Sequence, residues 1–287
     1  MPRGLDHVVH AVRDLDAAAA LYRALGFTVG ARNRHPWGTH NHIVQFSGCF
    51  IELLAVVEPD RIEGKGVPAL FGRFNQSFLE RREGLSMLVL ESTDATADAA
   101  SFAAAGIAAS GPVSFERDAQ RPDGSKVKVG FSLAFARDAA APEAGFFTCR
   151  QHYPENFWNP VLQQHPNTAT SLAGVVLTAE NPSDHHIFLS AFAGERELLA
   201  TSTGVAVTTP RGEIQVMAPA AFASHFGTPA PDIAAGARLA AIRVAAGDLA
   251  KARAMLGKSG IAVAERMGRL VVPPSAAIGA TLAFEAA

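Results

Sequence analysis

Two ionisable residues stand inside apolar stretches of the sequence, where their side chains could do chemistry. Glu52 lies within CFIELLAV, and His7 lies within LDHVVHAV. A lone carboxylate is costly to bury unless it binds a metal ion, accepts a hydrogen bond or holds a proton. Burial also raises the pKa of a carboxyl group toward the range in which it can act as a general base. We therefore expect Glu52 to belong to a site, whereas His7 is either part of that site or a hydrogen-bonded histidine of the core.

Polar side chains also gather in two other segments. In HPWGTHNH, strand alternation sends His40 and His42 to one face and Asn41 to the other, so they cannot all serve one site. We expect at least one of His40 and Asn41 to face a cleft. Arg121 in QRPDGSK adjoins turn-forming residues. Its guanidinium could nevertheless clamp a carboxylate or a phosphate through two hydrogen bonds.

The segment GFFTCRQH contributes two further candidates, Cys149 and His152. Cys149 has no basic partner that the sequence reveals, which favours a small buried residue over a nucleophile. We still count it among the candidate ligand contacts. Strict alternation places Cys149 and Gln151 on one face and His152 on the other. His152 therefore reaches the same site only if this strand is bulged or shifted.

The strands that would position these residues belong to a repeated unit. The order strand, helix and three strands recurs four times, beginning at LDHVVHAV, GLSMLVLES, SLAGVVLTAENP and RLAAIRVAAGDL. Asp14, and Thr93 or Asp94, are candidate N-caps of the first two helices. One such unit leaves the concave face of its sheet unfilled, so units pair into incomplete barrels with a natural ligand cleft inside. We predict an α+β fold of four βαβββ modules paired into two domains, residues 1–152 and 170–287, joined by a linker, 153–169.

The opening LDHVVHAVRDLDAAAALYRALGF and the strand FIELLAV resemble the vicinal oxygen chelate superfamily. That superfamily includes glyoxalase I, the fosfomycin and bleomycin resistance proteins and the extradiol ring-cleaving dioxygenases. Further strings are similar to its glyoxalase-like domain branch, namely GTHN, RPDG, CRQHYPENFW and HPNTATSLAGVVL. The resemblance covers residues 1–180 well and the remainder only by its βαβββ outline.

The resemblance implies a divalent metal ion that chelates two neighbouring oxygens of a ligand. It places His7 and Glu52 at metal-binding positions, with His152 as a third ligand if the strand is shifted. Two histidines and one carboxylate leave open positions on the metal, and Fe, Mn, Zn and Ni all remain open. The equivalent places in the other modules hold Met87 with Thr148 or Cys149, Gly174 with Gln215, and Ala241 with Ala283. We therefore expect the chemistry in the N-terminal pair and a structural role for the C-terminal pair.

Composition argues against several other classes of protein. The chain has 25 Lys and Arg against 27 Asp and Glu and a net charge of -2, which disfavours a nucleic-acid partner. It has no phosphate loop, GxGxxG or GxSxG motif, so we expect no nucleotide cofactor. No apolar run approaches the ~20 residues of a membrane span, and no signal peptide is visible. Two cysteines suit a reducing compartment, and we expect a cytoplasmic monomer or homodimer with a small-molecule ligand.

The leading functional hypothesis is a glyoxalase-like protein that binds a small oxygen-rich metabolite in the N-terminal cleft, as a divalent-metal-dependent lyase or isomerase. Glu52 would be catalytic, and the ligand would be oriented by His40, Asn41, Arg121, Cys149 and His152. The main alternative is a non-catalytic binding or sequestration protein of the bleomycin-resistance type. An extradiol-type ring-cleaving dioxygenase is a weaker alternative, since it predicts metal ligands in the C-terminal pair.

Overall fold

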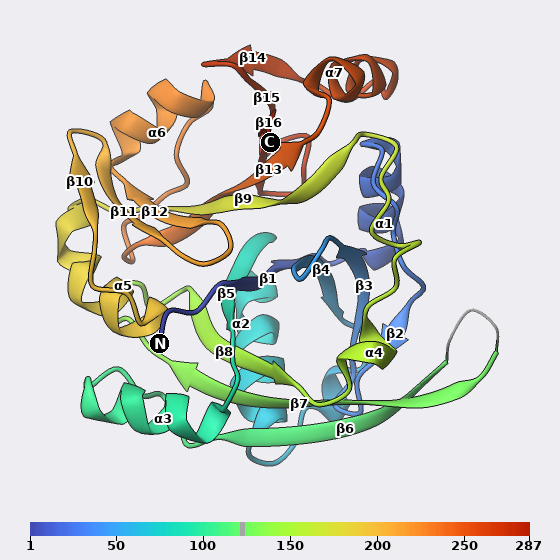
Figure 1. The fold of residues 1–287 in the computed structure, drawn as a ribbon, viewed down its shortest axis with the longest axis vertical. Helices are drawn as coiled ribbons and strands as arrows, with labels where there is room; N and C mark the ends of the chain where they lie inside the picture. Colours follow the sequence, from blue (N-terminus) through green and yellow to red (C-terminus); the bar gives the residue numbers. More distant parts are fainter. Residues whose placement is uncertain (121–123) are drawn as a thin grey trace.

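The structure is a computed structural model, and it describes residues 1–120 and 124–287. It contains two eight-stranded sheets, each built by one half of the chain (Figure 1). The strand order is β2-β3-β4-β1-β5-β8-β7-β6 in the first sheet and β10-β11-β12-β9-β13-β16-β15-β14 in the second. The two orders match position by position. The predicted α+β fold of four paired βαβββ modules is therefore confirmed.

The strands and helices of the two halves follow the same order along the chain. The N-terminal sheet consists of β1 (Leu5–Ala11), β2 (Asn33–Arg34), β3 (Thr39–Gln45), β4 (Phe50–Val56), β5 (Gly84–Glu91), β6 (Val113–Gln120), β7 (Lys126–Ala136) and β8 (Gly145–Gln151). The C-terminal sheet consists of β9 (Ala169–Thr178), β10 (Leu199–Thr201), β11 (Gly204–Thr208), β12 (Glu213–Met217), β13 (Arg238–Ala246), β14 (Ala264–Arg266), β15 (Arg269–Val272) and β16 (Thr281–Ala286). The module helices are α1 (Leu15–Ala24), α3 (Ala95–Ala104), α5 (His186–Ala193, preceded by η3, Pro182–His185) and α7 (Leu249–Lys258).

Side-chain caps start the module helices where the sequence predicts them. Asp14 accepts hydrogen bonds from the backbone N–H groups of Asp16 and Ala17, and Asp94, rather than Thr93, caps α3 in the same way. Such caps satisfy N–H groups that have no partner within the helix. After α1 the chain turns at Gly26, whose φ of +84° favours glycine. These local signals account for the repeated strand–helix–strand path.

The strand registers define equivalent positions in the four modules. In each module the first and last strands are parallel, and His7 of β1 lies opposite Phe50 of β4, two residues before Glu52. The register of β9 and β12 is the same, so Gln215 is the counterpart of Glu52 as expected. In the second module Met87 lies opposite Gly145, and the counterpart of Glu52 is Phe147. The expectation of Thr148 or Cys149 at that place was therefore off by one or two residues.

The halves share one apolar core and have separate concave interiors. The largest buried cluster joins residues of both sheets, such as Val8 of β1 and Ile242 of β13. The concave face of each barrel has one smaller cluster, around Val89 in the first barrel and around Ala241 in the second. Because the main core is continuous, the predicted domain boundaries stay a prediction. No helix in the described part of the chain is long and apolar enough to cross a membrane.

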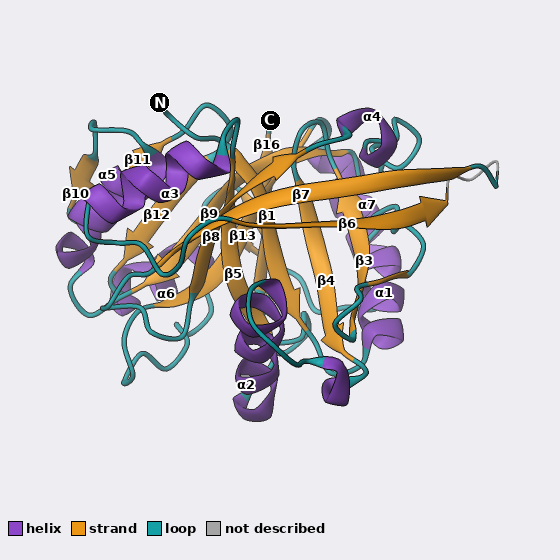
Figure 2. Ribbon diagram, turned by 90° about the horizontal axis from the view of Figure 1, so that it is seen from below, coloured by secondary structure: helices purple, strands orange, loops and turns teal. Residues whose placement is uncertain are grey.

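Three helices lie outside the repeat, and two of them cover the first barrel. The segment after β4 forms η1 (Pro59–Arg61), a π-helical turn η2 (Pro68–Arg73) and α2 (Phe74–Arg81), and α2 stands against the N-terminal sheet (Figure 2). The linker forms α4 (Pro154–Phe157), and α6 (Pro219–Phe226) belongs to the C-terminal half. The repeat pattern predicts none of the three helices.

Candidate functional site

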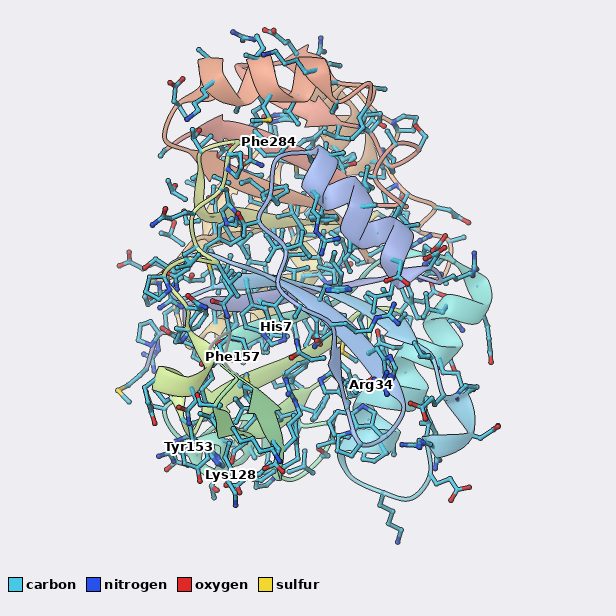
Figure 3. The ribbon with its side chains drawn as sticks, turned by 90° about the vertical axis from the view of Figure 1, so that its right-hand side faces the viewer. His7, Arg34, Lys128, Tyr153, Phe157 and Phe284 are labelled. Carbon is cyan, nitrogen blue, oxygen red and sulfur yellow. The ribbon has the colours of Figure 1, made fainter. Side chains whose placement is uncertain are left out.

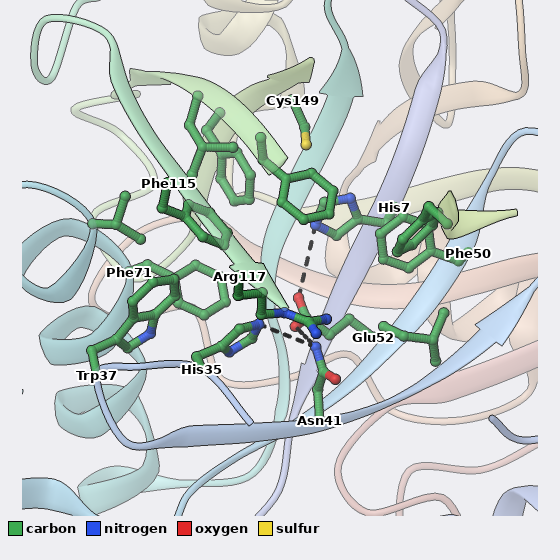
Figure 4. Close-up of a pocket in the computed structure, with 16 residues that line it drawn as sticks. His7, His35, Trp37, Asn41, Phe50, Glu52, Phe71, Phe115, Arg117 and Cys149 are labelled. Atoms are coloured by element: carbon green, nitrogen blue, oxygen red, sulfur yellow. Dashed lines mark hydrogen bonds and ion pairs between the residues drawn. The ribbon is translucent and has the colours of Figure 1, made fainter. Parts of the chain in front are cut away.

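The concave interior of the first barrel holds a cavity with aromatic walls. The space between its lining residues is about 520 Å³, including the part that is open to solvent. Phenylalanines form most of the wall: Phe50, Phe71, Phe115, Phe131, Phe147 and Phe157. The polar lining consists of His7, His35, Asn41, Glu52 and Arg117, with the indole of Trp37 beside them (Figure 4). A few polar groups thus converge at one end of an apolar cavity.

The carboxyl group of Glu52 is the centre of the polar end. Glu52 is 5% exposed, and Asn41 Nδ2 donates a hydrogen bond to its Oε1 at 2.5 Å. Burial raises the pKa of Glu52, and the opposing effects of His7, Asn41 and Arg117 do not cancel that rise. A carboxyl group with a raised pKa holds its proton more readily near neutral pH. The side chain can therefore exchange a proton with a molecule in the cavity.

His7 is oriented toward Glu52 by its neighbours. Its Nδ1 lies 2.5 Å from Asp6 Oδ1, and its ring stacks on Phe50 with centroids 4.2 Å apart. A carboxylate only accepts, so Nδ1 carries a hydrogen and donates it to Asp6. Nε2 lies 3.8 Å from Glu52 Oε2, too far for a direct hydrogen bond. Figure 3 locates His7 in the N-terminal half, well away from Phe284 of the C-terminal barrel.

Three cavity residues with polar side-chain atoms were not among the predicted site residues: His35, Trp37 and Arg117. The rings of His35 and Trp37 stack with centroids 4.8 Å apart, and burial lowers the pKa of His35 to about 3, so this imidazole is neutral. Arg117 reaches the cavity from β6. Alternation in VSFERD could have revealed it, because Phe115 and Arg117 share a strand face. Arg117 takes the place that the sequence suggested for Arg121, which lies outside the described residues.

The predicted site residues divide into two groups. His7, Asn41, Glu52 and Cys149 line the cavity. Burial raises the pKa of the Cys149 thiol well above its ordinary value, and the negative charges of Asp6 and Glu52 raise it further. Cys149 therefore behaves as an apolar wall residue rather than as a nucleophile.

Two predicted ligand contacts lie elsewhere. His40 points away from the cavity, with Nε2 3.1 Å from Glu58 Oε1. His152 interacts on the outer face with Ser132, Nε2 to Oγ 2.7 Å. The β7–β8 register is regular from Phe131 to Ala136, so no bulge turns His152 inward. The structure therefore does not bring His152 to His7 and Glu52, and the predicted three-residue metal set is not assembled.

The donor set can be tested against a metal ion. The four equivalent positions around the concave face hold His7, Glu52, Met87 and Phe147, and only the first two offer a nitrogen or oxygen ligand. Within the described residues no group of three or more His, Cys, Asp and Glu side chains is arranged to hold a metal. Asn41 already binds one Glu52 oxygen, and the cation of Arg117 lines the same cavity. These residues do not fit a facial metal triad.

The second barrel carries an ion-pair network on the corresponding face, at the wall of a cavity of its own. Arg243 of β13 donates to both oxygens of Glu285, at 3.1 and 2.6 Å. It also donates to Glu213 at 2.5 Å and to Gln215 at 2.9 Å, and Arg269 donates to Glu285 at 2.6 Å. A Cβ at Gly174 would approach Glu213 O to 2.8 Å and Arg243 Nη1 to 3.4 Å. The counterpart of His7 is thus a glycine whose lack of a Cβ leaves room for the backbone carbonyl of Glu213.

Comparisons with known proteins agree with this architecture. A family model described as "Glyoxalase-like domain" matches residues 5–192. A hypothetical protein from Staphylococcus aureus has a similar fold, with a TM-score of 0.68 and 12% identity over 99% of this chain and 100% of the other. A mutant 4-hydroxymandelate synthase from Streptomyces coelicolor gives a TM-score of 0.57 and 12% identity, covering 93% and 78% of the two chains.

A third solved structure is a xylose isomerase-like TIM barrel/4-hydroxyphenylpyruvate dioxygenase fusion protein. It gives a TM-score of 0.52 and 14% identity, covering 92% of this chain and 39% of the fusion. No curated protein matches the sequence. At these identities the three structures establish a shared fold and leave the reaction to be argued from the site.

Proposed function

Because the chain belongs to the glyoxalase-like domain family, we propose that its N-terminal cavity binds a small oxygen-bearing organic molecule and that Glu52 exchanges a proton with it. The observation that carries the proposal is a buried carboxyl group with a raised pKa at the polar end of an aromatic cavity. Proton transfer of this kind would suit a lyase or isomerase. Metal-dependent chemistry, which the family resemblance implies, is not part of this proposal. The cavity offers only two of the expected ligands among the described residues, His7 and Glu52.

The arrangement assigns each polar group a task. Asn41 holds the Glu52 carboxyl group in place through its 2.5 Å hydrogen bond. The 3.8 Å separation of His7 Nε2 and Glu52 Oε2 would let one ligand oxygen or hydroxyl contact both atoms. The apolar walls limit the water around Glu52, which strengthens these interactions. A proton could then pass between Glu52 and a carbon or oxygen of the bound molecule.

Binding without turnover is the second candidate, and a specific observation favours it. Met87 and Phe147 stand at two of the four positions around the concave face, and neither can act as an acid, a base or a hard metal ligand. A cavity in which only His7 and Glu52 of these four positions are ionisable could hold a ligand by packing and hydrogen bonds alone. The sequestration alternative therefore differs from the leading proposal in one property, proton exchange.

Proton exchange can be measured directly. We would incubate the protein in D₂O with a panel of small hydroxy-carbonyl compounds and acids, with and without EDTA, and follow C–H to C–D exchange by NMR and binding by thermal shift. We expect exchange for a bound compound with wild type and at least a 100-fold slower rate with Glu52→Gln. Glu197→Gln removes the same charge at an exposed position of the second half and should behave as wild type.

The outcomes separate the candidates. Undiminished exchange in folded Glu52→Gln would exclude Glu52 as the proton carrier. Binding without exchange in the wild type would select sequestration. Metal analysis of protein purified without chelator gives a further check, because stoichiometric metal that is lost in both His7→Ala and Glu52→Gln would restore the metal-dependent mechanism.

A further inference from the structure

Arg117 is a part-buried cation that forms no ion pair with a carboxylate of the described residues. Its guanidinium lines the cavity (Figure 4). Among the described residues no carboxylate oxygen lies within 4.0 Å of a guanidinium nitrogen. The hydrogen bond found for the side chain runs from Nη1 to Asp118 O and is long, at 3.4 Å. Its Nε is buried and has no partner in the described part of the chain. A part-buried cation of this kind costs folding free energy unless another group supplies a negative charge beside it.

None of the described surrounding groups pairs with the guanidinium directly. His35, which faces Arg117, is neutral at physiological pH because burial lowers its pKa to about 3. Glu52 influences the pKa of Arg117 but forms no ion pair with it within the 4.0 Å limit. One of its oxygens is instead held by Asn41. The polar end of the cavity therefore presents one guanidinium in an environment that favours an anion over a cation.

The second barrel shows what a guanidinium on the concave face binds when the protein supplies it. There Arg243 makes a two-point contact with the carboxylate of Glu285 and a further contact with Glu213. The planar fork of arginine matches a carboxylate in this way. In the first barrel no carboxylate of the described residues pairs with the guanidinium, so we expect its partner to come from a ligand.

The rest of the cavity indicates the body of the ligand. Six phenylalanines surround the space, and Phe115 meets the Trp37 ring edge to face at 4.8 Å. The indole Nε1 of Trp37 is a second buried donor that has no partner in the described part of the chain. Aromatic walls with a cation at one end suit a flat apolar group that carries one acidic head.

We propose that the N-terminal cavity recognises a small monocarboxylate with an apolar, ring-like body, whose carboxylate binds Arg117. This inference rests on the proposed function, since it names the ligand class of the same cavity. Glu52 and His7 then face the part of the ligand next to the carboxylate. The carboxylate anchor is a binding contact, and it is separable from proton exchange at Glu52.

Benzoate and its neutral counterpart benzamide are suitable probes, because they share one ring and differ in charge. Binding would be measured by calorimetry for wild type, Arg117→Met and Arg117→Lys. Arg34→Met is the matched control, since Arg34 is exposed on strand β2 of the same barrel. Circular dichroism and urea unfolding would establish that each variant is folded.

We expect wild type to bind benzoate at least about tenfold more tightly than benzamide. Arg117→Met should weaken benzoate binding about 10- to 100-fold, as expected for loss of a charge-assisted pair, and should change benzamide binding less than about twofold. Arg117→Lys should recover part of the benzoate affinity, because it keeps the charge and loses the planar fork. Arg34→Met should bind both compounds as wild type does.

Two results would overturn the inference. One is folded Arg117→Met that binds benzoate as tightly as wild type, and the other is wild type that prefers benzamide. If wild type prefers benzamide and Glu52→Gln alters that binding, the carboxylate inference fails while the proposed function stands. If neither compound binds wild type, both fail together.

Discussion

The two barrels have the same strand order but satisfy their buried charges in opposite ways. In the C-terminal barrel, Arg243 is surrounded by carboxylates of the protein. In the N-terminal barrel, Arg117 and Glu52 line one cavity without an ion pair between them. Charges that are mutually neutralised hold strands together, whereas charges left apart are available to a ligand. The same fold thus makes one interior in which the guanidinium is paired with carboxylates of the protein and one in which it is not.

The pKa directions of the two central carboxyl groups express this difference. Burial raises the pKa of Glu52 above its ordinary value, and its polar neighbours do not reverse the rise. For Glu285 burial also acts to raise the pKa, but hydrogen bonds from Arg243 and Arg269 outweigh it and lower the pKa below its ordinary value. The fold therefore favours a protonated carboxyl group in one barrel and an ionised one in the other.

The largest expected effect comes from removing each guanidinium in turn. Arg243→Met should lower the free energy of unfolding by about 3 kcal/mol, because it leaves Glu213 and part of the Glu285 charge unpaired in a part-buried network. Arg117→Met should change it by less than about 1 kcal/mol in the absence of ligand, since no ion pair is lost. Urea unfolding of both variants measures the difference. A larger loss in Arg117→Met than in Arg243→Met would reverse the comparison.

The pH dependence of stability should differ in sign between the barrels. A raised pKa in the folded state means that Glu52 contributes stability at low pH that is lost as pH rises from the unfolded value through the folded pKa. A lowered pKa means that Glu285 contributes stability above the unfolded value, which is lost as pH falls through the folded pKa. Each group can change the slope by at most about 1.4 kcal/mol per pH unit.

Unfolding experiments on Glu52→Gln and Glu285→Gln across pH 3 to 9 test this pair of signs. Compared with wild type, Glu52→Gln should gain relative stability as pH rises above about 4.5, whereas Glu285→Gln should lose relative stability as pH rises toward about 4.5 from below. Parallel pH profiles for the two variants would show that the barrels treat their carboxyl groups alike. Both substitutions conserve shape, so differences in packing contribute little.

The sequence predicts the architecture well and the site only in part. The fourfold repeat, the cap at Asp14 and the inward position of Glu52 follow from local patterns, and the structure agrees with them. Arg117 could have been found by extending the alternation of β6 from Phe115. The walls formed by Phe71 and Phe157 could not, because they come from η2 and α4, which lie outside the repeat and reach the cavity only through tertiary packing.

The C-terminal interior shows a second limit of reading a repeat by alignment. At the expected ligand positions Gly174, Ala241 and Ala283 carry no side-chain donor, and Gln215 carries an amide. The Arg243 side chain, however, stands two residues beyond Ala241 and interacts with Glu285, two residues beyond Ala283. The ion-pair network therefore lies two residues along each strand from the positions at which the repeat predicts metal ligands, on the same strand face.

The smallest expected effect is that of His152→Ala, because His152 does not line the N-terminal cavity. His152 lies on the outer face of the N-terminal sheet and contacts Ser132 and Glu116. Its removal should change the free energy of unfolding by less than about 0.5 kcal/mol and should leave ligand binding and metal content as in wild type. Calorimetry and metal analysis beside His7→Ala provide the measurement. A loss of binding or metal in His152→Ala that equals the loss in His7→Ala would return His152 to the site and require β8 to rearrange when the ligand binds.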